Sequence, residues 1–181
     1  FSGQELQELH AGIVSAADRY RCPLVGGDLT SWQGAGRLVV CVSMLSKPGD
    51  KPPVRRSGAK VGDVICVTGS LGGSGLRKHL DFEPRVEEAL EMVRLADLHA
   101  MMDISDGLST DLNRICTQSG VGAIVEASAL PISDDAKEQA DPLAAALNDG
   151  EDFELLFTLL PDQSDKLRGQ WRSSVPLTEI G

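Results

Sequence analysis

Long apolar runs, paired cysteines and an excess of basic residues are all missing from this chain. No stretch approaches the roughly 20 consecutive apolar residues that a membrane-spanning helix needs, so we expect no membrane partner. The four cysteines lie far apart and show no CxxC spacing, so neither zinc nor a disulfide framework is expected. A reducing cytoplasm is the natural setting for such a protein.

Basic residues are in the minority, with 17 Lys and Arg against 27 Asp and Glu and a formal net charge of −10. Nucleic-acid surfaces neutralise phosphates with clustered Lys and Arg, so this balance argues against a nucleic-acid partner. It does not exclude nucleotides, because Mg²⁺ can bring phosphates to an acidic protein. The 181 residues suffice for one compact domain, or for one domain plus part of another. The first residue is not Met and the chain ends abruptly at Gly181, so we expect a fragment of a longer protein.

Familiar catalytic loops are also missing. The glycine-rich segment 69–75 follows an apolar run, but it lacks the Gly-Lys-Ser/Thr of a P-loop and is not a clean GxGxxG. Anion binding and a tight strand-to-helix connection both remain open for it. No Gly-x-Ser-x-Gly elbow occurs, and the three histidines show no spacing typical of metal binding or nucleophilic catalysis.

Apolar periodicity predicts helices that alternate with strands. Helical spacing predicts helices over residues 3–20 and 85–98, and from about Ser105 to just before Gly120. Apolar runs predict strands over residues 38–45, 63–68, 121–126 and 153–160. Short helices are expected after Pro131 and Ser133 and from Asp141-Pro142 to Leu147. This alternation indicates helices that cover a sheet.

The clearest chemical signal is the segment Asp103-Ile104-Ser105-Asp106-Gly107-Leu108. Two carboxylates bracket a hydroxyl between an apolar run and a predicted helix. A helix start offers unpaired N–H groups to anions, and carboxylates beside it suit a Mg²⁺ ion held next to a nucleotide phosphate. The alternative is plain helix capping, for which Ser, Asp and Gly are also the preferred residues.

Three further segments carry candidate side chains. Gly26-Gly27-Asp28 delivers a carboxylate after a flexible glycine pair, or it is an ordinary turn. Arg55-Arg56 supplies guanidinium groups that could clamp a phosphate, or it is a solvated pair. Gly150-Glu151-Asp152 places two acids at the start of a strand, where neighbouring side chains face opposite ways, so at most one enters a given site.

Taken together, these segments resemble the thiamine-monophosphate kinase family of the aminoimidazole-ribonucleotide-synthetase-like superfamily. The matching elements occur in the family's order over residues 25–30, 56–63, 67–72, 84–86, 102–108 and 150–158. The resemblance covers nearly the whole chain. Asp-Ile-Ser-Asp-Gly-Leu and Gly-Glu-Asp-Phe-Glu-Leu are together far more specific than any single loop.

The resemblance implies ATP-dependent phosphorylation of thiamine phosphate to thiamine diphosphate by direct, Mg²⁺-assisted transfer. It implies ATP contacts for Gly27, Asp28, Arg56 and Ser105, Mg²⁺ contacts for Asp28, Asp103 and Asp106, and an approach of Glu151 to thiamine phosphate. No catalytic general base is expected, because a phosphate nucleophile is already ionised near neutral pH. A cytoplasmic enzyme that is a homodimer when full length is implied, and the isolated fragment is expected to be inactive.

The resemblance also predicts where the domains begin and end. We expect residues 1–47 to be the tail of an α/β amino-terminal domain that binds nucleotide and metal, and residues 48–55 to be a Pro-containing linker. Residues 56–181 are expected to form an α+β domain, incomplete at its end, with a mixed β-sheet covered by helices. Leu29 stands where the family more often has Thr. Selenophosphate synthetase, a purine-pathway synthetase and a non-catalytic module that binds nucleotide or a partner are the alternatives.

Overall fold

The computed structural model describes residues 2–31, 34, 36–47, 49, 51–76 and 78–181. The chain divides into two units, Phe1–Lys47 and Pro48–Gly181, and each is described here by itself. Two residues of the predicted linker, 48 and 50, lie outside the described residues, and the predicted domain ranges stay a prediction. Among the described residues, no helix combines the length and the apolar character needed to cross a membrane.

The amino-terminal unit contains the helix that the periodicity predicts, α1 (Gly3–Arg19). Ser2 caps this helix reciprocally with Glu5: the Ser2 Oγ accepts the N–H of Glu5 at 3.2 Å, and the Glu5 carboxylate accepts the N–H of Ser2 at 2.7 Å. The strand predicted over residues 38–45 is wrong, because these residues form no regular element and Leu45 is 94% exposed. A strand needs a neighbour for its N–H and C=O groups, and the described part of this unit contains no other strand.

The second unit is built on a four-stranded sheet in the order β2-β3-β1-β4. Its strands are β1 (Val64–Thr68), β2 (Leu98–Asp103), β3 (Leu155–Leu159) and β4 (Leu177–Glu179). The predicted α+β class is confirmed. We predicted a mixed sheet, but the pairings between these four strands are all antiparallel. The parallel pairing found among the described residues is one isolated bridge, between Leu71 and Ile132.

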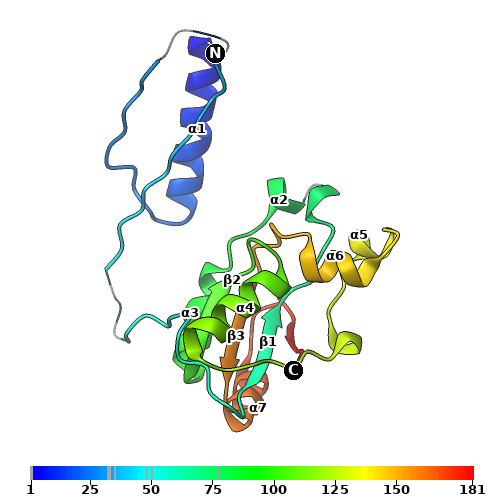
Figure 1. The fold of residues 1–181 in the computed structure, drawn as a ribbon. Coiled ribbons are helices and arrows are strands. Elements are labelled where there is room, and N and C mark those ends of the chain that lie inside the picture. The colour runs from blue at the N-terminus through cyan, green and yellow to red at the C-terminus, as the bar shows by residue number, and fades with distance from the viewer. Residues whose placement is uncertain (1, 32–33, 35, 48, 50, 77) are drawn as a thin grey trace. The chain divides into compact units, whose positions relative to one another are not determined.

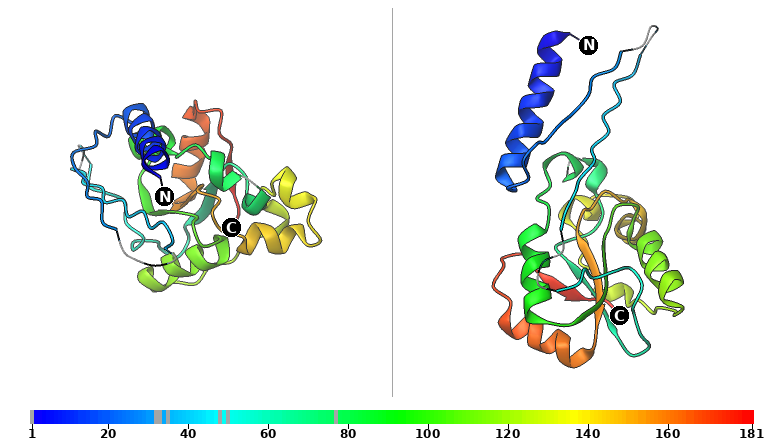
Figure 2. Two further views of the ribbon diagram at one scale, coloured as in Figure 1. Left: turned by 90° about the horizontal axis from the view of Figure 1, so that it is seen from above. Right: turned by 90° about the vertical axis from the view of Figure 1, so that its left-hand side faces the viewer.

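Helices cover both faces of this sheet (Figures 1 and 2). Helix α4 (Leu108–Ser119) packs on one face, whereas α3 (Val86–Leu95) and α7 (Pro161–Gln170) pack on the other. Neighbouring strand residues face opposite layers, so Leu156 packs in the core under α4 and Phe157 packs in the core under α3 and α7. The sheet thus carries two separate apolar layers.

Short elements complete the unit. They are η1 (Ser74–Leu76), α2 (Lys78–Asp81), η2 (Ala127–Ala129), α5 (Asp134–Lys137) and α6 (Pro142–Asn148). The side chains of Ser133 and Asp141 cap α5 and α6, which confirms both predicted helix starts. The strand predicted over residues 121–126 is wrong. Among the described residues, a single backbone bond, from the Glu126 N–H to the Ile180 carbonyl, joins this segment to the chain end, and one bond does not form a strand ladder.

A cavity of about 230 Å³ lies against the α4 face of the sheet and is lined by Ile65, Ile115 and Thr158. The Thr158 hydroxyl is buried and has no hydrogen-bond partner among the described residues. Because an unpaired buried hydroxyl destabilises the folded state, Thr158→Val should raise the free energy of unfolding by about 1 kcal/mol. Urea denaturation measures this change. Thr178→Val, at a partly exposed position of β4, is the matched control, and an equal gain there would contradict the explanation.

Candidate active site

The Asp103–Gly107 segment connects the end of β2 to the start of α4. The helix predicted from Ser105 begins three residues later, at Leu108, and Gly107 is its N-cap residue with a φ of 105°. A Cβ at Gly107 would lie 3.1 Å from the backbone of Asn148, so glycine is required there. No side chain caps α4. The capping interpretation of the two acids is therefore not realised, because neither carboxylate caps the helix.

Asp111 shapes this segment, although the sequence analysis did not single it out. Its side chain is completely buried, and its Oδ2 accepts the backbone N–H groups of Ser105 and Asp106, both at 2.9 Å. Arg114 donates to the Asp111 Oδ1 at 2.6 Å and also pairs with the Asp106 carboxylate. The hydrogen bond to Asp106 raises the pKa of the Arg114 guanidinium. The sequence signal that could have identified Asp111 is its position on the apolar stripe of α4, three residues after Leu108.

The Gly150–Asp152 segment lies directly beside the Asp103–Gly107 segment. The N–H of Glu151 donates to the Ser105 carbonyl at 2.8 Å, and the N–H of Phe153 donates to the Ile104 carbonyl at 2.9 Å. Glu151 and Phe153 both have positive φ angles, 53° and 51°, which are unusual for residues with a side chain. The two most specific motifs of the sequence therefore meet in one place.

The two acids of this segment face different surroundings, in line with the expectation that at most one enters a given site. Glu151 is exposed, whereas Asp152 is 1% exposed and accepts the N–H of Gly72 at 2.9 Å. Burial raises the pKa of Asp152 to about 6, against the opposing effects of that hydrogen bond and of Lys78. The N–H of Gly73 is taken by Asp149 in the same way. The glycine loop is thus a tight connection whose amides at Gly72 and Gly73 are occupied.

A second buried carboxylate, that of Glu154, packs against the start of the same loop. It accepts hydrogen bonds from Arg85 at 2.7 and 2.8 Å and from the Thr68 hydroxyl at 2.8 Å, and Lys78 Nζ lies 3.3 Å away. Burial alone would raise the pKa of Glu154, but the bonds from Arg85, the Lys78 charge and the Thr68 bond together hold it below its usual value. Gly69, with a φ of 60°, leaves the space that this carboxylate fills, since a Cβ there would lie 2.1 Å from Oε1.

The raised pKa of Asp152 makes stability depend on pH. Its pKa is about 6 in the folded protein against 3.8 ordinarily, so the folded state binds the proton more tightly. The contribution of Asp152 to the free energy of unfolding is fully present below pH about 4. It is lost as the pH rises through about 6, by up to about 1.4 kcal/mol per pH unit. Asp152→Asn should therefore remove this decline. Urea titrations between pH 4 and 8 measure the difference, and an unchanged slope in the variant would contradict the assignment.

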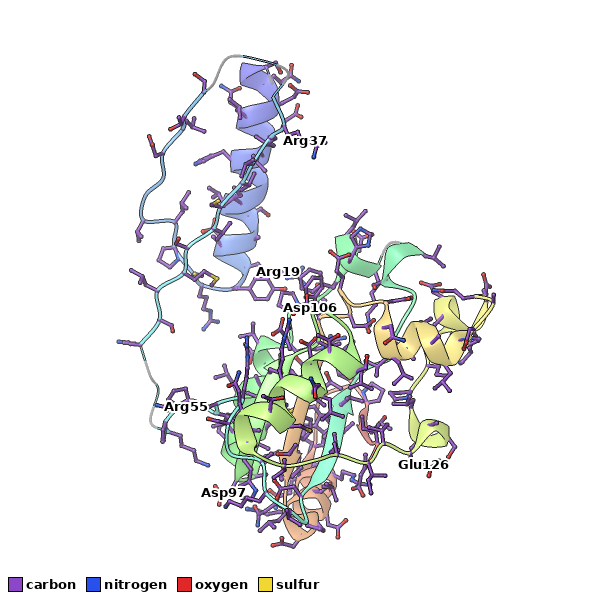
Figure 3. All side chains as sticks on the ribbon, in the orientation of Figure 1. Arg19, Arg37, Arg55, Asp97, Asp106 and Glu126 are labelled. Carbon is purple, nitrogen blue, oxygen red and sulfur yellow. The ribbon has the colours of Figure 1, made fainter. Side chains whose placement is uncertain are left out.

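The remaining predicted site residues fall into two groups. In the second unit, Asp103 is exposed and its carboxylate has no hydrogen bond to any described residue, while the Asp106 side chain is 54% exposed. Asp106 lies at the opposite end of this unit from Asp97 and Glu126 (Figure 3). Arg56 is exposed, and its carbonyl accepts the Ser119 hydroxyl at 3.3 Å.

Gly27 and Asp28 belong to the amino-terminal unit, where both are exposed. The Thr30 hydroxyl lies 3.4 Å from the Asp28 carboxylate, a long contact that leaves the carboxylate open to other ligands. Leu29, between them, is 81% exposed. This segment therefore presents a carboxylate without burying it.

The donor set of the second unit fits Mg²⁺. This ion takes one or two carboxylates, keeps several waters and shares substrate phosphates, rather than requiring a cage made only of protein. Asp103 and Asp106 supply two carboxylates within four residues, and that of Asp103 has no hydrogen-bond or ion-pair partner among the described residues. The described residues contain no group of three or more His, Cys, Asp or Glu side chains that could hold a metal by themselves. The arrangement suits a cation completed by phosphate oxygens.

Two curated proteins are similar in sequence to this chain. Thiamine-monophosphate kinase of Rhodopirellula baltica is 40% identical over 180 residues, which cover 96% of this chain and 55% of that protein. The corresponding protein of Methanospirillum hungatei is 38% identical, with 98% and 62% covered. The chain thus spans little more than half the length of these curated relatives.

Solved structures of similar proteins share the fold of this chain. The crystal structure of thiamine-monophosphate kinase from Stenotrophomonas maltophilia K279a superposes with a TM-score of 0.64 at 36% identity, over 71% of this chain and 49% of that one. AaThiL complexed with AMPPCP and TMP gives a TM-score of 0.59 at 31% identity, over 71% and 47%. Residues 60–181 match the family described as AIR synthase related protein, C-terminal domain. The chain therefore belongs to the AIR synthase related protein family, and the two curated relatives described above are named thiamine-monophosphate kinase.

Proposed function

We propose that the protein transfers the γ-phosphoryl group of ATP to thiamine phosphate, which forms thiamine diphosphate. The observation that carries this proposal is the hydrogen bond from Glu151 to Ser105, which aligns the candidate substrate segment with the candidate nucleotide and metal segment. The relatives named thiamine-monophosphate kinase support it, as does the complex of one similar protein with AMPPCP, an ATP analogue, and TMP.

Each site residue then has a separate task. Asp103 and Asp106 would hold Mg²⁺, which would neutralise charge on the transferred phosphoryl group, and the Mg²⁺ contact of Asp28 stays a prediction. Ser105 and Arg56 would contact the nucleotide, and Glu151 would contact thiamine phosphate, while the nucleotide contact of Gly27 stays a prediction. The phosphate of the acceptor is already ionised, so these residues need only position two anions for in-line transfer.

The proposal extends to the cellular setting and the assembly. All four cysteines are free thiols, which is in keeping with a reducing cytoplasm. The exposed apolar residues of the amino-terminal unit, such as Val42 and Leu45, are in keeping with a full-length homodimer formed through that part of the protein.

The test is a kinase assay on the intact protein with ATP, Mg²⁺ and thiamine phosphate, with thiamine diphosphate measured by chromatography. Parallel reactions contain selenide or formylglycinamidine ribonucleotide in place of thiamine phosphate. We expect product only with thiamine phosphate. Turnover with one of the other acceptors would identify a sister enzyme instead, and ATP binding without any product would identify a non-catalytic nucleotide-binding module.

A further inference from the structure

We propose that Arg114 is a resident counterion of the Asp106 carboxylate and that a divalent cation displaces it on binding. This inference rests on the proposed function, because it takes Asp106 as a cation ligand. The direct observation is that the Arg114 guanidinium pairs with the Asp106 carboxylate while Asp103, three residues earlier, has no partner among the described residues. One of the two carboxylates is therefore free to bind a cation and the other is already occupied.

Asp111 makes this exchange possible without leaving a charge unpaired. Its buried carboxylate holds the N–H groups of Ser105 and Asp106 with one oxygen and Arg114 with the other, at 2.6 Å. When a cation replaces the guanidinium at Asp106, Arg114 keeps its bond to Asp111. The planar guanidinium suits this role because its several N–H groups can serve two carboxylates at once.

The exposed fractions of the two side chains keep the competition reversible. Asp106 is 54% and Arg114 is 39% exposed, so water screens their attraction and an ordinary divalent cation can overcome it. Asp111, in contrast, is completely buried and cannot exchange its partner with solvent ions. The pair Asp111–Arg114 thus fixes the position of the segment and keeps Asp106 neutralised until a cation arrives.

The test measures the affinity of the intact protein for Mn²⁺ alone, without nucleotide, by calorimetry or by the electron-spin signal of free Mn²⁺. Arg114→Gln removes the competing charge and should tighten Mn²⁺ binding roughly fivefold. Arg114→Lys keeps a charge but not the forked donor geometry. Its Mn²⁺ affinity should therefore lie between those of the unaltered protein and Arg114→Gln. The matched control is Arg94→Gln, which removes the same charge from the exposed end of α3 on the opposite face of the sheet.

Each outcome bears on a separate claim. Equal Mn²⁺ affinity in Arg114→Gln and Arg94→Gln, or weaker binding in Arg114→Gln, would overturn the counterion proposal. Asp106→Asn tests the cation site itself and should weaken Mn²⁺ binding. If Asp106→Asn bound Mn²⁺ as well as the unaltered protein, the assignment of Asp106 within the proposed function would fall. A merely structural role of Arg114 predicts no gain in affinity when the residue is replaced.

Discussion

Asp103→Asn is expected to lower the rate of phosphoryl transfer about a hundredfold or more and to leave the fold intact. The effect is large because the carboxylate would hold a cation against the charge that develops on the transferred group. The fold should tolerate the change because Asp103 is exposed and its carboxylate accepts no hydrogen bond from any described residue. Steady-state rates of the intact protein at limiting Mg²⁺ measure the effect, and circular dichroism checks the fold.

The control for this variant is Asp165→Asn, which makes the same chemical change at an exposed position of α7. It should retain the full rate. A partial recovery of Asp103→Asn at high Mg²⁺ would agree with a weakened cation site. Near-normal turnover of Asp103→Asn at limiting Mg²⁺ would remove this residue from the proposed machinery.

Arg85→Met is expected to destabilise the protein by about 3 to 5 kcal/mol, the typical cost of removing one partner from a buried ion pair. The methionine side chain fills similar space but removes two hydrogen bonds from Glu154, which is 1% exposed. Among the described residues, Lys78 and the Thr68 hydroxyl then remain to compensate that charge. Urea denaturation at pH 7 measures the loss.

The same type of replacement at a solvent-exposed pair should do far less. Arg168 pairs with Glu179, and both side chains are more than a third exposed, so Arg168→Met should cost less than about 1 kcal/mol. Adding Glu154→Gln to Arg85→Met removes the uncompensated charge and should restore part of the stability. If Arg85→Met and Arg168→Met lowered the free energy of unfolding by similar amounts, the buried pair would stabilise the protein no more than the exposed pair.

These two predictions concern connected parts of the molecule. Glu154 lies at the start of β3, and its carbonyl accepts the N–H of Ile104 at 2.8 Å, next to the Asp103–Gly107 segment. Asp152 holds the glycine loop from the same stretch of chain. The buried network therefore lies next to the exposed residues Glu151 and Asp103 and supports the segments that carry them. A site that holds charged ligands needs this kind of fixed frame.

Local patterns were sufficient for much of the fold. The helices α1 and α4, the strands β1 and β3 and the caps of α5 and α6 follow from periodicity and from residues that stop or start an element. The start of α4 was predicted three residues early, because the close contact of Gly107 with Asn148 is not visible in the local pattern. The motif residues Asp103, Asp106 and Glu151 were also predicted from the sequence, since their spacing is local, and the structure brings their two segments side by side.

Contacts between distant segments decided the rest. The apolar runs 38–45 and 121–126 have strand-like composition but no ladder, because a strand forms only where another strand satisfies its backbone groups. Asp111, Arg85 and Glu154 are ordinary charged residues in the sequence, and their roles come from partners that folding brings to them. Burial turns such charges into strong constraints, because an uncompensated charge away from water is costly. Residue order therefore specified the chemical groups of the candidate site, and packing specified which of them are buried with partners and which are exposed.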